Sequence, residues 1–162
     1  MSILLFRFVR LQCCPGYEKI PGEPGCTGSK PLDDLVKTAE NLRLKHFSQF
    51  ARKKSFQRNL KKNQAYTIFV PSDDAISDSI RTSGVVSEST ALYHVVPGRL
   101  NFSDFVRTQE YRSVFQDAKI RVNKYPNGVG TVNCARILRP NNEASNGIIH
   151  IIDQVSQNLP NI

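Results

Sequence analysis

Two adjacent carboxylates, Asp73 and Asp74, have the residue types and spacing that most readily suggest chemistry. Such a pair serves acid–base catalysis or metal binding when further His, Glu or Asp side chains converge on it. Here it follows Pro71 and Ser72, a pattern typical of a helix start, where the helix dipole stabilises negative charge. The sequence has no Ser/His/Asp arrangement, phosphate-binding Gly loop or nucleotide fingerprint. It therefore predicts a protein without enzyme activity, metal site or cofactor.

The cysteines are unevenly placed, with Cys13, Cys14 and Cys26 in a Pro/Gly-rich segment and Cys134 far away in a strand-like region. Crowded cysteines of this kind are typical of an oxidised extracellular module. A disulfide from Cys13 or Cys14 to Cys26 would close a loop of about 13 residues and stabilise the fold by roughly 3 kcal/mol. Zinc is the alternative, but the nearest histidine, His46, lies on a predicted helix without ligand spacing. We favour the disulfide.

The net charge of +8 is concentrated in residues 43–62. This segment holds eight basic residues and no acid, while the other 14 basic residues balance the chain's 14 acids. Such a patch can bind a polyanion such as heparan sulfate by salt-sensitive charge pairing, or it can be the solvated face of a helix. We keep both readings and do not expect nucleic acid as a partner. The basic residues are Arg43, Lys45, Arg52, Lys53, Lys54, Arg58, Lys61 and Lys62.

The chain shows no clear signal for its own secretion, although a secreted protein is expected. The apolar run in Met1 to Val9 is interrupted by Arg7 and is shorter than a signal peptide requires. No stretch approaches the roughly 20 apolar residues of a membrane span. We expect Met1 to be a fragment or gene-model boundary with a signal upstream. Asn101 begins an N-glycosylation sequon that Ser103 completes.

Hydrophobic spacing predicts two helices in the first part of the chain. The first is expected to start at Pro31, followed by Asp33 and Asp34 in its first turn. The second is expected to run through the basic segment, with its apolar side chains inward and its charges in water. The inward residues are Leu32, Leu35, Val36, Ala39 and Leu42 in the first helix and Leu44, Phe47, Ala51, Phe56 and Leu60 in the second.

A strand at Tyr66–Val70 and two helices are predicted next. Ser72 is a good N-cap for the helix after this strand, and a short helix over Ser87–Val95 should end before Pro97, where the chain must turn.

From Tyr111 onward the pattern is typical of β-strands. Asn127 with Gly128 indicates a hairpin before a strand at Val129–Cys134, and Asn146 with Gly147 indicates another turn. The apolar run after Gly147 predicts a strand buried on both faces, with His150 as a structural histidine. Helices early and strands late make an α+β domain.

Three blocks in fixed order resemble the signature of fasciclin domains. They are Tyr66–Ala75 (YTIFVPSDDA), Leu92–Arg99 (LYHVVPGR) and Asn146–Asp153 (NGIIHIID). Their order and spacing resemble the family as well, and the resemblance covers about Pro31 to Leu159. It implies a fasciclin-like fold, in which helices pack on a wedge-shaped β-sandwich of short strands.

The segment from Cys13 to Cys26 resembles the end of the cysteine-rich EMI-type module that precedes the first fasciclin domain in secreted matrix proteins of this family. We therefore predict an EMI-type remnant and linker at residues 1–28 and a fasciclin domain at 29–160. The resemblance also implies that Cys134 bridges to a neighbouring module.

The resemblance implies an extracellular matrix or cell-adhesion protein that binds collagen, fibronectin, proteoglycans with their glycosaminoglycans, and integrins. In the family, the residues at Tyr93 and His94 are the proposed integrin-recognition pair. The alternative is that both are buried and hydrogen-bonded within the core, and we favour this structural role. Two other functions stay open, namely a heparin-binding protein that uses residues 43–62 and a purely structural matrix spacer.

Overall fold

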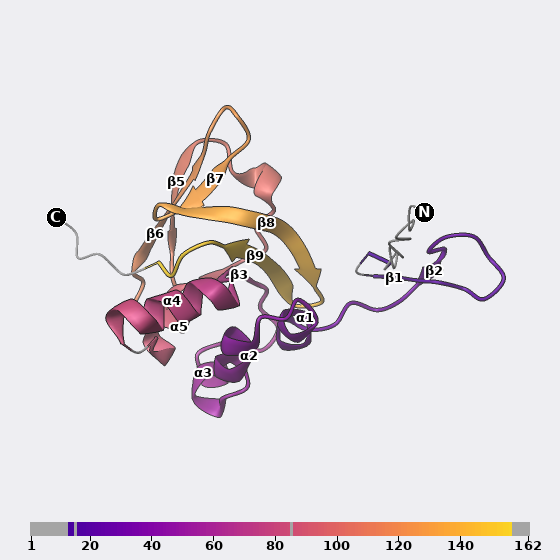
Figure 1. Cartoon of the computed structure of the whole chain (residues 1–162), viewed down its shortest axis with the longest axis horizontal. Helices are drawn as coiled ribbons and strands as arrows, with labels where there is room; N and C mark the ends of the chain where they lie inside the picture. The colour runs from indigo at the N-terminus through magenta and orange to yellow at the C-terminus, as the bar shows by residue number, and fades with distance from the viewer. Residues whose placement is uncertain (1–12, 15, 85, 157–162) are drawn as a thin grey trace, which may run out of the picture. The chain divides into compact units, whose positions relative to one another are not determined.

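The computed structural model describes residues 13–14, 16–84 and 86–156. It separates into two compact units, Met1–Leu32 and Asp33–Ile162, which are coloured along the chain in Figure 1. The expectation about Met1 to Val9 lies outside the described residues. The assignment of residues 1–28 and 29–160 to an EMI-type remnant and a fasciclin domain stays a prediction.

The first unit contains a small antiparallel ribbon of two strands, β1 (Tyr17–Glu18) and β2 (Gly28–Ser29). A disulfide joins Cys13 to Cys26, whose Cα atoms are 5.6 Å apart. The prediction of a disulfide bond is thus confirmed, and of the two possible partners for Cys26 the structure uses Cys13. Cys14 is an exposed free thiol in the described part of the chain.

The second unit contains helices and strands in the order predicted for an α+β domain. Among its described residues no helix is long and apolar enough to cross a membrane. The helices are α1 (Leu35–Asn41), α2 (Lys45–Ala51), α3 (Lys54–Arg58), α4 (Asp73–Ser83), α5 (Glu88–Tyr93) and the 3₁₀ helix η1 (Phe102–Asp104). The strands are β3 (Tyr66–Pro71), β4 (Val95–Pro97), β5 (Thr108–Arg112), β6 (Lys119–Lys124), β7 (Gly130–Val132), β8 (Ala135–Ala144) and β9 (Gly147–Ile152).

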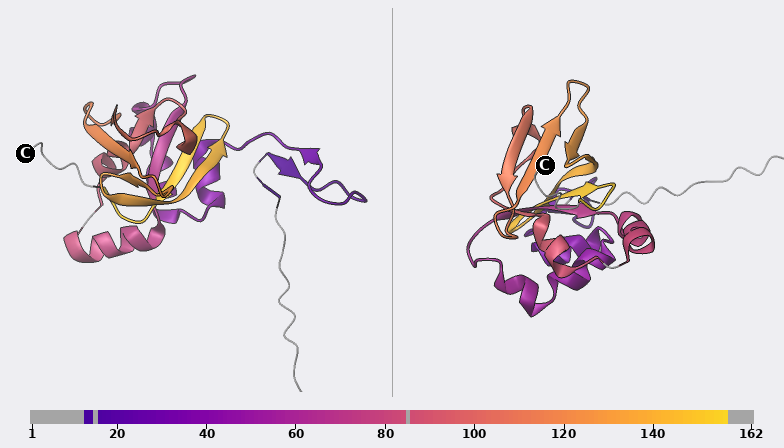
Figure 2. Two further views of the ribbon diagram at one scale, coloured as in Figure 1. Left: turned by 90° about the horizontal axis from the view of Figure 1, so that it is seen from above. Right: turned by 90° about the vertical axis from the view of Figure 1, so that its left-hand side faces the viewer.

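The strands form one sheet in the order β4-β3-β9-β8-β7-β6-β5. Among the strands that the structure describes, only β3 and β9 pair in parallel. β8 pairs with β7 through its first residues and with β9 through its later ones, and its register shifts on both sides of Arg139. Such irregularities bend a strand, so β8 leads from one half of the sheet into the other. The right-hand view of Figure 2 shows the helices on one side of the β3–β9 half and the remaining strands on the other.

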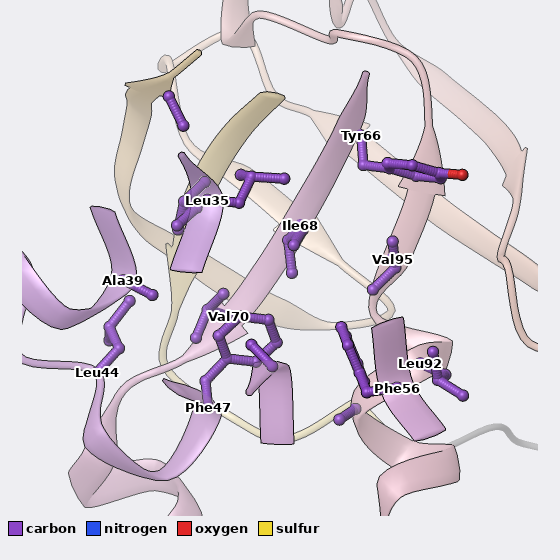
Figure 3. Close-up of a cluster of buried hydrophobic side chains, with 14 of the residues drawn as sticks. Leu35, Ala39, Leu44, Phe47, Phe56, Tyr66, Ile68, Val70, Leu92 and Val95 are labelled. Carbon is purple, nitrogen blue, oxygen red and sulfur yellow. The ribbon is translucent and has the colours of Figure 1, made fainter. Parts of the chain in front are cut away.

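Two hydrophobic cores lie on opposite faces of β3 and β9. Ile68 and Val70 of β3 belong to the cluster under the helices, which Figure 3 shows, whereas Phe69 belongs to the cluster between the two halves of the sheet. In β9, Ile151 and Ile152 divide in the same way. This is the two-residue alternation of a strand. All six residues of β9 are buried, so the prediction of a strand covered on both faces is confirmed.

The expected start of the first helix at Pro31 is wrong. α1 begins at Leu35, and Asp34 is its N-cap because its carboxylate accepts a hydrogen bond from the N–H of Lys37 at 2.8 Å. A capping side chain satisfies a free N–H group of the first turn, which a proline cannot do. The start is held further by Asn146, whose Oδ1 accepts from the Leu35 N–H at 2.8 Å.

The single helix expected through the basic segment is also wrong, since the structure has α2 and α3 with a break at Lys53. On one continuous helix, Phe47 and Phe56 would point about 180° apart, because each residue turns by about 100°. The break brings both rings into the same core, where they meet edge to face at 6.0 Å between centroids.

Three element boundaries in the second half of the chain differ from the predicted ones. The helix expected over Ser87–Val95 ends at Tyr93, and Val95 already pairs in β4. The strand expected at Val129–Cys134 is limited to β7, because Asn133 and Cys134 form a turn with φ of 46° and 74°. The last turn lies one residue earlier than expected, since Ala144 pairs with Gly147 across it. β8 has no counterpart in the sequence predictions.

Gly147 lies close against the backbone of β3. A Cβ atom at this position would lie 2.0 Å from the Tyr66 carbonyl oxygen and 2.9 Å from a Leu35 methyl group. We expect Gly147→Ala to lower the free energy of unfolding by about 3 kcal/mol, because the parallel β3–β9 pair must separate to admit the methyl group. Chemical denaturation measures this. Ser145→Ala, at an exposed position in the same turn, is the control, and an equal effect of both variants would contradict the prediction.

Candidate functional site

Tyr93 closes α5 with its ring inside the fold, and only 3% of the residue is exposed. Its hydroxyl donates a hydrogen bond to the Lys119 carbonyl oxygen of β6 at 2.8 Å and accepts one from the Asn133 side-chain amide. Burial raises the pKa of the Tyr93 hydroxyl above its ordinary value. The phenol thus connects α5 to β6 and to the β7–β8 turn.

His94 is the C-cap residue of α5 and is 2% exposed. Its Nδ1 lies 2.7 Å from the Thr90 carbonyl oxygen, and its Nε2 lies 3.0 Å from the Ser156 backbone nitrogen. Since the carbonyl can only accept and the N–H can only donate, the ring is neutral with its proton on Nδ1. Burial lowers the pKa of His94 to about 4, against the opposing effect of the Thr90 hydrogen bond.

The segments around this pair are joined to one another by further internal bonds. The Phe69 N–H of β3 donates to the His94 carbonyl at 3.0 Å, and the Ser113 hydroxyl donates to the Leu92 carbonyl at 3.1 Å. The Ser156 hydroxyl donates to the Val132 carbonyl of β7 at 3.1 Å. We call Tyr93 and His94 with these partners the Tyr93–His94 junction. The Tyr93 hydroxyl and both ring nitrogens of His94 are hydrogen-bonded to other parts of the domain.

The surface nearest to His94 is a small apolar pit between α2, α4 and α5. Its volume is about 10 Å³, and its walls include Phe47, Ile76 and Ala91. A space of this size holds no more than about one water molecule. The pit therefore gives no partner access to the imidazole.

All eight residues of the predicted basic patch are exposed. They do not share one helix, because they lie on α2, α3 and the adjoining loops. The Arg52 guanidinium is paired with the Glu40 carboxylate, which holds the pKa of Glu40 below its usual value, and the Lys53 ammonium lies 5.0 Å from the Phe50 ring centroid. The other six basic side chains form no ion pair with any described residue.

Acids from other elements reach this segment, which the sequence did not indicate. The Asp73 carboxylate accepts hydrogen bonds from the N–H groups of Lys45 at 3.1 Å and His46 at 3.2 Å, so it caps α2 from 27 or more positions away. Glu88 accepts from the Ser55 hydroxyl at 2.8 Å. Asp73 therefore has a structural role in addition to its place in the first turn of α4. Among the described residues, no three His, Cys, Asp or Glu side chains are grouped closely enough to hold a metal ion.

Asn101 is the N-cap of η1; its N–H donates to the Asp104 carboxylate at 2.7 Å, and its carbonyl oxygen accepts from the Asp104 N–H at 2.9 Å. Its side-chain amide nitrogen, the atom that carries an N-glycan, donates to no described residue, and Ser103 is exposed. Cys134 is an exposed free thiol within the described part of the chain. His150 is structural as expected, because it is fully buried and its Nε2 donates to the Leu100 carbonyl at 2.8 Å.

We expect acid to destabilise the fold through His94. Its pKa of about 4 in the fold lies below the ordinary 6.5, so the unfolded chain binds more protons between these values. The contribution, roughly 3 kcal/mol, is fully present above about pH 6.5 and is lost as the pH falls towards 4. His150 acts in the same direction, since burial lowers its pKa too. His94→Gln should thus reduce the dependence of the melting temperature on pH between 7 and 4, with His46→Gln as control. An unchanged dependence in His94→Gln would contradict this.

Comparison with known proteins gives the context of these features. The family model of the fasciclin domain matches residues 42–157. Transforming growth factor-beta-induced protein ig-h3 of Sus scrofa is 33% identical over 162 residues, which cover 94% of this chain and 24% of that protein. Periostin of Homo sapiens is 30% identical over 155 residues, covering 91% of this chain and 18% of periostin. The chain thus spans a quarter or less of these relatives.

A solved structure confirms the fold. A FAS1 domain pair from the insect cell adhesion molecule fasciclin I superposes with a TM-score of 0.64 at 19% identity, covering 82% of this chain and 54% of that one. The predicted α+β architecture, with helices packed on a wedge-shaped β-sandwich, is therefore present. Together with the match of the family model to most of the chain, this shows that the protein belongs to the fasciclin domain family.

Proposed function

We propose that the chain is a secreted, non-enzymatic adhesion module of the extracellular matrix that acts through its surface. The observation that carries the proposal is its similarity to ig-h3 and periostin together with its likeness to a cell adhesion molecule. The match to ig-h3 covers more of the chain than Asp33–Ile162 alone provides, which supports an EMI-type remnant before the fasciclin domain. The Cys13–Cys26 disulfide suits an oxidising compartment.

Collagen, fibronectin, proteoglycans and integrins are the partners we propose, each bound weakly by one domain and more strongly by several together. We also propose that Cys134 bridges to a neighbouring module, which its exposed free thiol in the described part of the chain supports. We assign Tyr93 and His94 an indirect part in adhesion. Because both are buried with their polar atoms bonded internally, they shape the surface around α5 without contacting an integrin themselves.

Cell attachment to the immobilised chain tests this function. We expect attachment to rise steeply when the chain is clustered, because linked weak sites gain effective concentration. His94→Ala should lower the melting temperature, and at temperatures where the variant remains folded it should still support attachment. A normal melting temperature with lost attachment would show that His94 contacts the receptor. No attachment at any density would favour a purely structural spacer.

Polyanion binding by the basic segment is the second candidate. It rests on six exposed basic side chains that form neither an ion pair nor a cation–π contact with described residues, namely Arg43, Lys45, Lys54, Arg58, Lys61 and Lys62. Three acids, Glu40, Asp73 and Glu88, lower the local charge. The ligand we propose is a glycosaminoglycan such as heparan sulfate, held by salt-dependent charge pairing.

Heparin retention distinguishes the paired from the unpaired cations. Replacing Lys54, Arg58 and Lys61 with Gln should lower the salt concentration needed for elution, because each removes a free charge. Arg52→Gln should have a smaller effect, since that guanidinium is already paired with Glu40. The triple replacement of Arg112, Arg136 and Arg139 with Gln is the matched control, because these exposed cations on the strands also form no ion pair with a described residue. Retention that survives the first set and falls with the control set would exclude this segment.

N-glycosylation at Asn101 is the third feature that the structure supports. We expect peptide-N-glycosidase to increase the mobility of the secreted chain, because the Asn101 amide nitrogen is free and Ser103 is exposed. Ser103→Ala should abolish the shift without disturbing the cap of η1. A shift that persists in Ser103→Ala would contradict the assignment.

A further inference from the structure

A shallow groove of about 530 Å³ lies between the segment before β5 and the β6–β7 hairpin. Ser103, Val106 and Arg107 line it on one side, and Lys124, Tyr125 and Pro126 line it on the other. None of these residues belongs to the Tyr93–His94 junction or to the basic segment, so the groove is a separate feature of the surface.

Two positive charges face each other at this groove. The antiparallel pairing of β5 and β6 continues one position beyond Thr108 and Asn123, since the Lys124 N–H donates to the Arg107 carbonyl at 3.1 Å. Like charges placed directly opposite in a ladder are destabilising. Neither side chain forms an ion pair with a described residue. Two acids lie three positions from Arg107 in sequence: Asp104 accepts from the Asn101 N–H, and Glu110 is paired with Lys119 and Arg121. A cationic pair of this kind leaves a place for an external anion.

Lys124 is held in position at this groove. Its ammonium donates to the Phe102 carbonyl at 3.2 Å and lies 4.8 Å from the centroid of the Phe102 ring. Phe102 in turn packs on Gly130, where a Cβ atom would lie only 2.4 Å from the ring. Lys124 lies on the same face of β6 as the buried residues Ile120 and Val122, because strand residues two apart share a face. Its positive charge therefore lies at the end of β6, where this inward face reaches the surface.

The groove also exposes apolar surface next to the charges. Tyr125 is 49% exposed and Val106 is 72% exposed. The Tyr125 N–H donates to the Val129 carbonyl at 2.8 Å, and the Lys124 N–H donates to the Arg107 carbonyl at 3.1 Å, so these two N–H groups on the hairpin side are already bonded. On that side the groove offers side chains for recognition, namely the Tyr125 ring and the Lys124 ammonium.

From this arrangement we infer that the groove binds an acidic saccharide. Its carboxylate or sulfate group accepts charge-assisted hydrogen bonds from Arg107 and Lys124, while the apolar face of a sugar ring lies on the Tyr125 ring. The Ser103 hydroxyl is available to a sugar hydroxyl. The open form of the groove admits one or two sugar units of a longer chain from the side.

The test uses the full chain, produced without N-glycosylation, and three probes of known size. They are a chondroitin sulfate tetrasaccharide, neutral maltotetraose and a hexaglutamate peptide. We expect the acidic tetrasaccharide to shift the backbone NMR signals of Val106, Arg107 and Tyr125. Arg107→Gln and Tyr125→Ala should each weaken its binding by about tenfold. Arg112→Gln, which removes the same charge from the far end of β5 and outside the groove, should leave binding within about twofold.

Several outcomes with these probes and variants would overturn the inference. They are no shift with the acidic tetrasaccharide, equal binding of maltotetraose, binding of hexaglutamate without the saccharide, and equal weakening by Arg112→Gln and Arg107→Gln. Shifts confined to residues 43–62 would also overturn it, while leaving the proposed polyanion site of that segment intact. The two sites are thus tested independently.

Discussion

The fold depends on the burial of β3 and β9 on both faces. These parallel strands carry one core towards the helices and a second core towards the rest of the sheet, so both cores are lost if they separate. The two strands can lie close together at this point because Gly147 has no side chain to collide with the Tyr66 carbonyl. Arg99 adds to this closure, since its guanidinium donates to the carbonyls of Ala144, Ser145 and Gly147.

The Tyr93–His94 junction lies where this central pair meets α5. Both residues are almost fully buried, and their hydrogen bonds join a helix, two strands, a turn and the segment at Ser156. A buried pair in this position affects the surface indirectly, because its hydrogen bonds fix the relative positions of the elements that form that surface. In the adhesion function that we propose, the pair is therefore needed without being exposed, and the contacting residues that we propose lie on the exposed basic segment and in the groove beside Tyr125.

Much of the fold was predictable because its signals are local. A run of β-branched residues, a Ser N-cap and an Asn-Gly hairpin each act over a few residues, and β3, α4 and the β6–β7 hairpin appear as expected. The break between α2 and α3 was missed, although Phe56 would lie about half a turn out of phase with Phe47 on one continuous helix, and this spacing could have indicated it. Other features join distant parts of the chain. The cap of α2 by Asp73 and the opposition of Arg107 and Lys124 follow only from tertiary structure.

Amide hydrogen exchange of the central strands tests this account most directly. If β3 and β9 support both cores, the amides of Ile68, Val70, Ile149 and Ile151 should exchange only through global unfolding and be the slowest in the chain. Their exchange free energies should equal the unfolding free energy from chemical denaturation, while β5, at the edge of the sheet, exchanges through local opening. Exchange of β3 and β9 as fast as that of β5 would contradict the account.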